Sequence, residues 1–239
     1  MCTLILAIDV VAPGTVLLGA NRDENPARRS DPPLRLSEAP PIAGGRDRVA
    51  GGTWLALHGR DTAIAMLNRR GSGGSAPTRS RGLLALDVAR DPRPEVPFEC
   101  LVRERYAPFT LVVARPVRSW LLAWDGERAR MIEISPGWHV LTHTELDDPQ
   151  EPRAAWLMRS LAALGALSRE QAEREVAARL ARHQPPAVCL HDGPMATVSS
   201  ALVWLARGEA RLAHAEGSPC VTPHADYSHL LAEAEAEDS

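Results

Sequence analysis

The sequence predicts an α+β fold built as a layered sandwich, with two β-sheets inside and helices outside. Two short hairpins open the chain. A helical pair and a β-meander follow, and a second helical pair precedes the last strands. Two sheets and two separate helical pairs pack most economically as layers, because each apolar face must be buried against another element. A single mixed sheet uses the same elements and remains the alternative.

The strands are predicted from short β-branched and aliphatic runs that end at turn signals. The first hairpin joins residues 2–11 to 15–20, and the second joins residues 52–58 to 62–68. Residues 25–50 are rich in proline and charge, so they are expected to form a long surface loop. The later strands are predicted at residues 109–114, 120–124, 129–134, 139–142, 187–191, 197–206 and 210–215.

Four helices are predicted, at residues 82–89, 98–105, 153–164 and 169–183. The last begins with Ser168 as its N-cap and has Gln171 three residues later, which is the pattern of a capping box. Gly71–Gly74 reads GSGG, but no lysine follows at the spacing of a phosphate-binding loop. We therefore interpret that segment as a linker.

Length and composition indicate one globular domain. The 239 residues are 45% hydrophobic and 24% charged, and the net charge is −3, which gives no electrostatic attraction to nucleic acid or an acidic membrane. We expect one domain over residues 1–232 and a frayed acidic tail over 233–239. All 27 basic residues are arginines, which excludes lysine-based Schiff-base and phosphate-loop chemistry.

The cysteine pattern and the first residues favour a cytoplasmic protein. The four cysteines are widely and irregularly spaced, as is typical of a reducing compartment. The first apolar run contains Asp9 and has no basic segment before it, so it does not resemble a signal peptide. No stretch approaches the roughly 20 apolar residues of a membrane span. The sequence makes no prediction of oligomeric state.

Cys2 is the first candidate for chemistry. Its small side chain permits removal of Met1, which frees the α-amine of Cys2. That amine has a pKa near 8, so part of it is neutral at pH 7 and can accept the thiol proton. The alternative is a small residue at position 2 without a catalytic role.

Asn21, Arg22, Asp23 and Glu24 stand together where the first hairpin returns towards Cys2. A guanidinium near the sulfur would lower the pKa of the thiol, and a carboxylate could hold the α-amine by hydrogen bonds. The alternative is a solvated, ion-paired strand end.

These motifs together resemble the NRDE family, also called the transport and Golgi organisation family. The resemblance includes MC at the start, NRDE, GGTW at Gly51–Trp54, Asn68 after an apolar strand, LTH at 141–143 and TVSS at 197–200. That family is similar to cysteine N-terminal-nucleophile hydrolases such as choloylglycine hydrolase and penicillin V acylase. The resemblance implies a four-layer αββα sandwich with two mainly antiparallel sheets.

Carried over by position, the resemblance makes Cys2 the nucleophile and Arg22 and Asp23 the charged pair beside it. Asn68 falls where those amidases place an oxyanion-hole residue. His143 stands where they have an asparagine amide, and an imidazole can still donate a hydrogen bond to an oxyanion.

Val198 is a second departure, because many relatives carry an arginine there. We expect Asn21, Glu24 and Trp54 to bind substrate. Trp54 is included because it follows Gly51-Gly52, where the backbone can approach a ligand closely.

The sequence therefore favours a hydrolase that cleaves a non-peptide amide or a thioester through an acyl-Cys2 intermediate, with no required cofactor. The alternative is a carrier on the same fold that binds haem, acyl-CoA or lipid. Late cysteines and histidines offer possible metal or haem ligands, but their spacing lacks the paired knuckles of zinc sites. We assign no metal, interpret Cys189 as a buried apolar position on a strand and expect the histidines near 224–229 at the surface. The late candidates are Cys189, His191, Cys220, His224 and His229.

Overall fold

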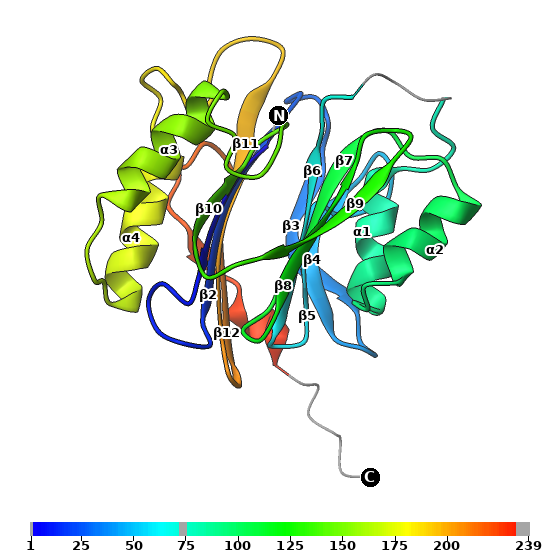
Figure 1. Cartoon of the computed structure of the whole chain (residues 1–239), viewed down its shortest axis with the longest axis horizontal. Coiled ribbons are helices and arrows are strands. Elements are labelled where there is room, and N and C mark those ends of the chain that lie inside the picture. Colours follow the sequence, from blue (N-terminus) through cyan, green and yellow to red (C-terminus); the bar gives the residue numbers. More distant parts are fainter. Residues whose placement is uncertain (1, 72–75, 233–239) are drawn as a thin grey trace.

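The computed structural model describes residues 2–71 and 76–232, which form two antiparallel sheets between two pairs of helices (Figure 1). The first sheet has the strand order β10 (Gly137–Leu141), β1 (Thr3–Ile8), β2 (Val16–Glu24), β11 (Ala196–Ala206), β12 (Glu209–Ala215) and β13 (Ala225–Asp226). The second runs in chain order through β3 (Ser30–Ser37), β4 (Ile42–Asp47), β5 (Leu55–His58), β6 (Thr62–Asn68), β7 (Phe109–Ala114), β8 (Ser119–Trp124) and β9 (Ala129–Ile134).

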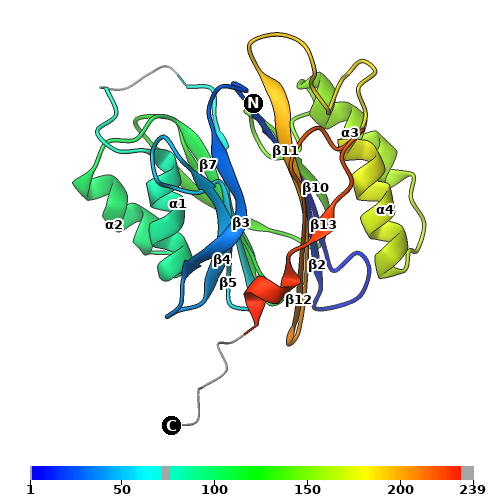
Figure 2. The same ribbon diagram turned by 180° about the vertical axis from the view of Figure 1, so that it is seen from behind.

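The helices cover the outer faces of the sheets, as the two opposite views show (Figures 1 and 2). The first sheet is covered by α3 (Pro152–Ala162) and α4 (Arg169–Leu180), and the second by α1 (Arg81–Arg90) and α2 (Val96–Arg103). The predicted four-layer αββα sandwich is therefore confirmed, and the single mixed sheet is excluded. None of the helices in the described residues is long and apolar enough to cross a membrane.

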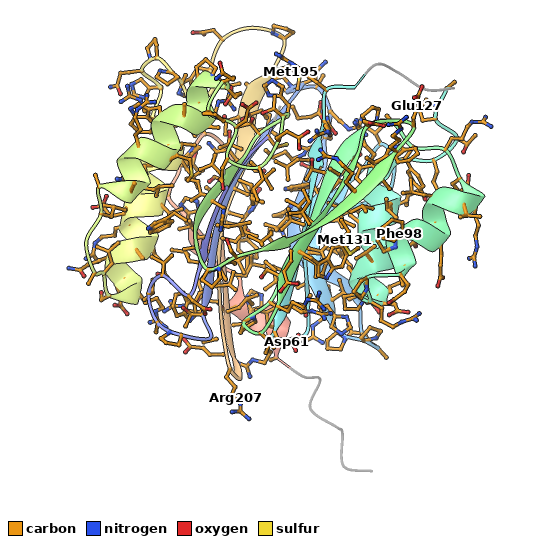
Figure 3. All side chains as sticks on the ribbon, in the orientation of Figure 1. Asp61, Phe98, Glu127, Met131, Met195 and Arg207 are labelled. Carbon is orange, nitrogen blue, oxygen red and sulfur yellow. The ribbon has the colours of Figure 1, made fainter. Side chains whose placement is uncertain are left out.

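The strands of the first sheet are apolar on both faces because both faces are buried. Ile5 and Leu17 pack against α3 and α4, whereas Leu4 and Leu18 belong to the core between the sheets. Side chains fill the space between the two sheets (Figure 3). At one edge the short 3₁₀ helix Ser228–Leu231 adds Leu231 to this central core, near the end of the described chain (Figure 2).

Most predicted elements are present, including the hairpins, the meander and the four helices. The predicted capping box of α4 is confirmed, because Ser168 and Gln171 each bond the backbone N–H of the other. The expected tail at 233–239, and residues 72–75 of the expected linker, lie outside the described residues.

The loop predicted for residues 25–50 is wrong, because this segment contains the hairpin of β3 and β4. Pro32 and Pro33 lie inside β3, where their lack of a backbone N–H argues against a central strand. They are tolerated because β3 is an edge strand and its register shifts between Asp31 and Leu34.

The strand predicted for residues 187–191 is also wrong, because the segment is irregular. The N–H groups of Val188 and Cys189 both donate to the carbonyl of Arg182, a turn rather than a ladder. Cys189 is buried as expected, but it does not lie on a strand. The segment is therefore apolar because it is buried in the tertiary structure, and not because it forms a strand.

Gly52, two residues before Trp54, allows its backbone to approach the backbone of α1 closely. A Cβ on Gly52 would lie 2.2 Å from the carbonyl carbon of Gly82 in the first turn of α1. Thr53 donates its N–H to the carbonyl of Gly82 at 2.9 Å. The close approach therefore packs the start of α1 against the segment that leads into β5.

We predict that Gly52→Ala lowers the free energy of unfolding by about 1–3 kcal/mol, because the added methyl group must displace backbone of α1. The measurement is urea unfolding followed by circular dichroism. Gly165→Ala is the control, since a Cβ at that position has open space around it. Equal stability of the Gly52 variant and the wild type would contradict this packing.

Candidate active site

The NRDE segment forms the end of β2, and its side chains alternate between the two faces of the strand. Arg22 and Glu24 line a pocket on the side of the second sheet. Asn21 and Asp23 point the other way, where Asp23 contacts Arg153 of α3. The four neighbours in sequence are thus divided between two environments.

A pocket of about 110 Å³ collects most of the residues predicted for catalysis and substrate binding. Thr3 of β1 pairs with Asn21 of β2, which brings the chain start beside the end of the NRDE segment. The predicted residues that line the pocket are Cys2, Arg22, Glu24, Trp54 and Asn68.

Cys2 is half-buried and packs against the core between the sheets. Burial raises the pKa of its thiol above the ordinary value, and the carboxylate of Asp23 raises it further. A hydrogen bond from the Asp23 backbone and the charge of Arg22 oppose this rise without cancelling it. The thiol is therefore protonated at neutral pH, and a nucleophilic role needs a base beside it.

Asp23 is fully buried, and two side chains from other elements bond its carboxylate. Thr197 of β11 donates to Oδ1 at 2.7 Å, and Arg153 of α3 donates to Oδ2 at 3.1 Å. The same Nη1 atom of Arg153 donates to Oγ1 of Thr3 at 2.7 Å. Burial raises the pKa of Asp23, and its bonds with Thr197 and Arg153 oppose that rise. The carboxylate is thus fixed beside the start of β1.

Two cations, the buried Arg22 and the half-buried Arg81, lie near Cys2. The guanidinium of Arg22 lies 4.5 Å from the centre of the Trp54 ring and donates to Ser30 at 3.1 Å. Arg81, the first residue of α1, donates to the carbonyl of Pro108 at 2.8 Å. Burial lowers the pKa of both arginines, and interaction with Cys2 opposes this effect. The pocket also meets the N-terminus of α1, whose dipole favours negative charge.

Asn68 ends β6 and lines the pocket, where the structure places it together with Cys2. His143 follows β10 and is buried, but it is not among the residues that line the pocket. Neither of its ring nitrogens has a hydrogen-bond partner among the described residues. Burial lowers the pKa of His143, and the nearby Arg70 lowers it further, which favours the neutral imidazole.

Asn21 and Val198 lie away from the pocket lining. The amide of Asn21 donates to the carbonyls of Leu180 at 2.9 Å and Val188 at 3.1 Å, so it connects β2 to the end of α4. Val198 occupies an irregularity of β11, where the register against β2 shifts between Thr197 and Ser199.

Sequence reasoning missed Arg153 and Arg81. No local signal marks either residue, since Arg153 reaches Asp23 across 130 positions of sequence and Arg81 follows a segment interpreted as a linker. Thr197 belonged to a recognised motif, but its bond to Asp23 depends on the pairing of β11 with β2.

Comparison with solved structures shows that the fold is that of N-terminal-nucleophile hydrolases. A Caenorhabditis elegans ortholog of N-acylethanolamine-hydrolyzing acid amidase is similar with a TM-score of 0.57 and 14% identity, over 84% of this chain and 92% of that chain. Two variants of the conjugated bile acid hydrolase from Clostridium perfringens are similar with TM-scores of 0.54 and 13% identity, over 98% of this chain and 95% of theirs.

The sequence itself identifies the family. The profile of the family described as Transport and Golgi organisation 2 matches residues 1–190, so the chain belongs to that family. No curated protein matches the sequence.

We predict that Arg22→Gln raises the pKa of Cys2 further and slows its alkylation at pH 8 severalfold, because a cation that stabilises the thiolate is lost. Iodoacetamide labelling across pH, read by peptide mass spectrometry, measures this. Arg28→Gln is the control, since Arg28 lines the same pocket but is paired with Asp47. An unchanged or lowered pKa in Arg22→Gln would contradict the assignment.

We predict that Arg153→Met lowers the free energy of unfolding by about 3 kcal/mol, because it removes the cation that contacts the buried Asp23 carboxylate. The carboxyl group of Asp23 has a raised pKa in the folded state. Such a group contributes stability at pH values below its unfolded pKa, and this stability is lost as the pH rises. The deficit should therefore be larger at pH 8 than at pH 5.

Urea unfolding at both pH values tests this. Arg159→Met, an exposed position on the same helix, should have little effect. Adding Asp23→Asn to Arg153→Met should recover part of the loss, since no carboxylate then remains. A deficit that is independent of pH would contradict the role of Arg153.

Proposed function

We propose that this chain is a cysteine N-terminal-nucleophile hydrolase that cleaves a non-peptide amide or a thioester. One observation carries the proposal: Cys2 enters a small pocket together with Arg22 and Asn68, while Asp23, near the end of β2, is joined through Arg153 to Thr3 at the start of β1. The similar solved structures support an amide bond, because they are of an acid amidase and a conjugated bile acid hydrolase.

The reaction requires a base, since burial raises the pKa of the Cys2 thiol. Removal of Met1 supplies one, because the freed α-amine of Cys2 accepts the thiol proton. We assign Asp23 the role of accepting a hydrogen bond from that amine, and the bonds of Arg153 to both Asp23 and Thr3, the residue after Cys2, support this role.

The sulfur of Cys2 then attacks the acyl carbon, and the carbonyl oxygen becomes an oxyanion. Asn68, which lines the pocket, donates a hydrogen bond to that oxygen, whereas the buried His143 does not reach the pocket lining. The α-amine returns the proton to the leaving nitrogen as the C–N bond breaks. Water cleaves the resulting thioester, which releases the acid and restores the thiol.

The charge of the pocket indicates an anionic group on the substrate. Arg28 forms ion pairs with Asp47 and Glu24 in this pocket. Arg22 and Arg81 have no ion pair with a carboxylate among the described residues. Trp54 offers an apolar surface beside Arg22. We therefore favour acyl conjugates that carry a carboxylate over neutral ones.

A carrier function remains the rival proposal. A pocket of about 110 Å³ is smaller than the roughly 300–1,000 Å³ of sites that enclose large ligands, which favours the hydrolase over a haem carrier. We also propose a cytoplasmic location, since all four cysteines are free, as is typical of a reducing compartment.

The test is hydrolysis of N-acyl amino acids and of matched N-acylethanolamines, with acid quenching to trap the acyl-enzyme for mass spectrometry. We expect turnover of the carboxylate series and one acyl group on Cys2. Cys2→Ala should abolish both, and Asn68→Ala should lower kcat about 10²–10³-fold. Cys100→Ala, a cysteine of α2, should leave the rate unchanged.

Turnover that survives Cys2→Ala would overturn the proposal. If the protein is a carrier instead, no acyl adduct will form on Cys2, and the purified protein will show haem absorbance or bound acyl-CoA.

A further inference from the structure

A cluster of cysteine and histidine side chains lies outside the pocket described above. His183, Cys189 and His191 belong to the irregular segment between α4 and β11, and Cys220 lies between β12 and β13. The sequence analysis named Cys189, His191 and Cys220 as possible ligands but assigned no metal to them, and it did not include His183. The chain folds them together near the start of β11.

The distances within the cluster are short. Sγ of Cys189 lies 3.8 Å from Sγ of Cys220 and 3.7 Å from Nε2 of His191, and Sγ of Cys220 lies 3.1 Å from the same nitrogen. A ring nitrogen of His183 lies within 4.8 Å of the ligand atoms of His191 and Cys220. His191 and Cys220 thus lie at the centre of the cluster, with His183 close to both and Cys189 close to both.

These distances match tetrahedral coordination. Zinc–sulfur bonds of about 2.3 Å and zinc–nitrogen bonds of about 2.0 Å place two sulfurs about 3.8 Å apart, and sulfur and nitrogen about 3.5 Å apart. A mixed set of thiolates and imidazoles in a tetrahedron selects zinc over magnesium or calcium. A disulfide between Cys189 and Cys220 would leave both histidines without a function.

We propose that Cys189, His191, Cys220 and His183 bind one zinc ion. The two thiols release their protons to solvent when the ion binds, so the site gains two thiolates and no oxidation occurs. Four protein ligands leave no open position, which makes the site structural and not catalytic. The remaining late histidines do not belong to it, since His224 bonds Ser200 and the ring of His229 stacks on Tyr227.

The site would fix the backbone that supports Asp23. Leu190, between two of the ligands, exchanges hydrogen bonds with Thr197 at 2.8 and 2.9 Å. Ser218, two residues before Cys220, donates to the carbonyl of Thr197 at 3.0 Å. Zinc would therefore join both segments that contact Thr197, the residue that bonds Asp23.

The experiment uses the full chain, without a histidine tag and purified without chelators. We expect about one zinc per chain by elemental analysis. After zinc removal and reduction by a phosphine, Co²⁺ should give the intense visible absorption of a tetrahedral site and a thiolate charge-transfer band.

His191→Gln and Cys220→Ser should weaken Co²⁺ binding at least 100-fold, since loss of an outer-sphere partner alone costs about 10–100-fold. Both side chains lie at or near the surface, so neither variant removes core packing. His229→Gln and Cys100→Ser are the matched controls and should bind as wild type does. Zinc removal should lower Tm in the wild type and in the controls, but not in His191→Gln.

Absence of zinc together with no tetrahedral Co²⁺ spectrum would overturn the proposal. Equal Co²⁺ affinity in wild type and His191→Gln would do the same. So would a reduced protein that binds no metal and regains only a Cys189–Cys220 disulfide in air.

Discussion

The hydrogen bonds to the buried carboxylate of Asp23 are the interaction on which the candidate site depends. Thr197 and Arg153 hold it from β11 and α3, and Arg153 also holds Thr3 beside Cys2. A carboxylate in this position costs free energy by desolvation unless such partners are present. The chain therefore places a buried charge where three elements of the fold must meet, and this fixes the start of β1.

The alternation of side chains along β2 separates two tasks that the sequence presents as one. Arg22 and Glu24 face the pocket, whereas Asn21 and Asp23 face the helices and organise the backbone. One strand thus carries both the electrostatics of the pocket and its support. The pKa of the Cys2 thiol reflects both faces, since Arg22 lowers it and Asp23 raises it.

Much of the fold was predictable because its signals are local. The capping box at Ser168 and the short apolar strands follow from neighbouring residues, and so does the return of the NRDE segment to Cys2. The errors arose where contacts between residues far apart in the sequence determine the local structure. The prolines of β3 are tolerated because β3 is an edge strand. Residues 187–191 are apolar because they are buried, and hydrogen bonds with Asn21 and Arg182 hold them in a turn instead of a strand. Arg153 could not be found at all, because only the packing of α3 brings it to Asp23.

The central claim is that Cys2 becomes the first residue of the working protein, and its α-amine the base. The most direct measurement is the intact mass and N-terminal sequence of the protein purified in active form. We expect a chain that begins at Cys2, and loss of activity when a bulky residue that blocks removal of Met1 is inserted between Met1 and Cys2. A fully active chain that retains Met1 would contradict the claim, because its α-amine would then belong to another residue.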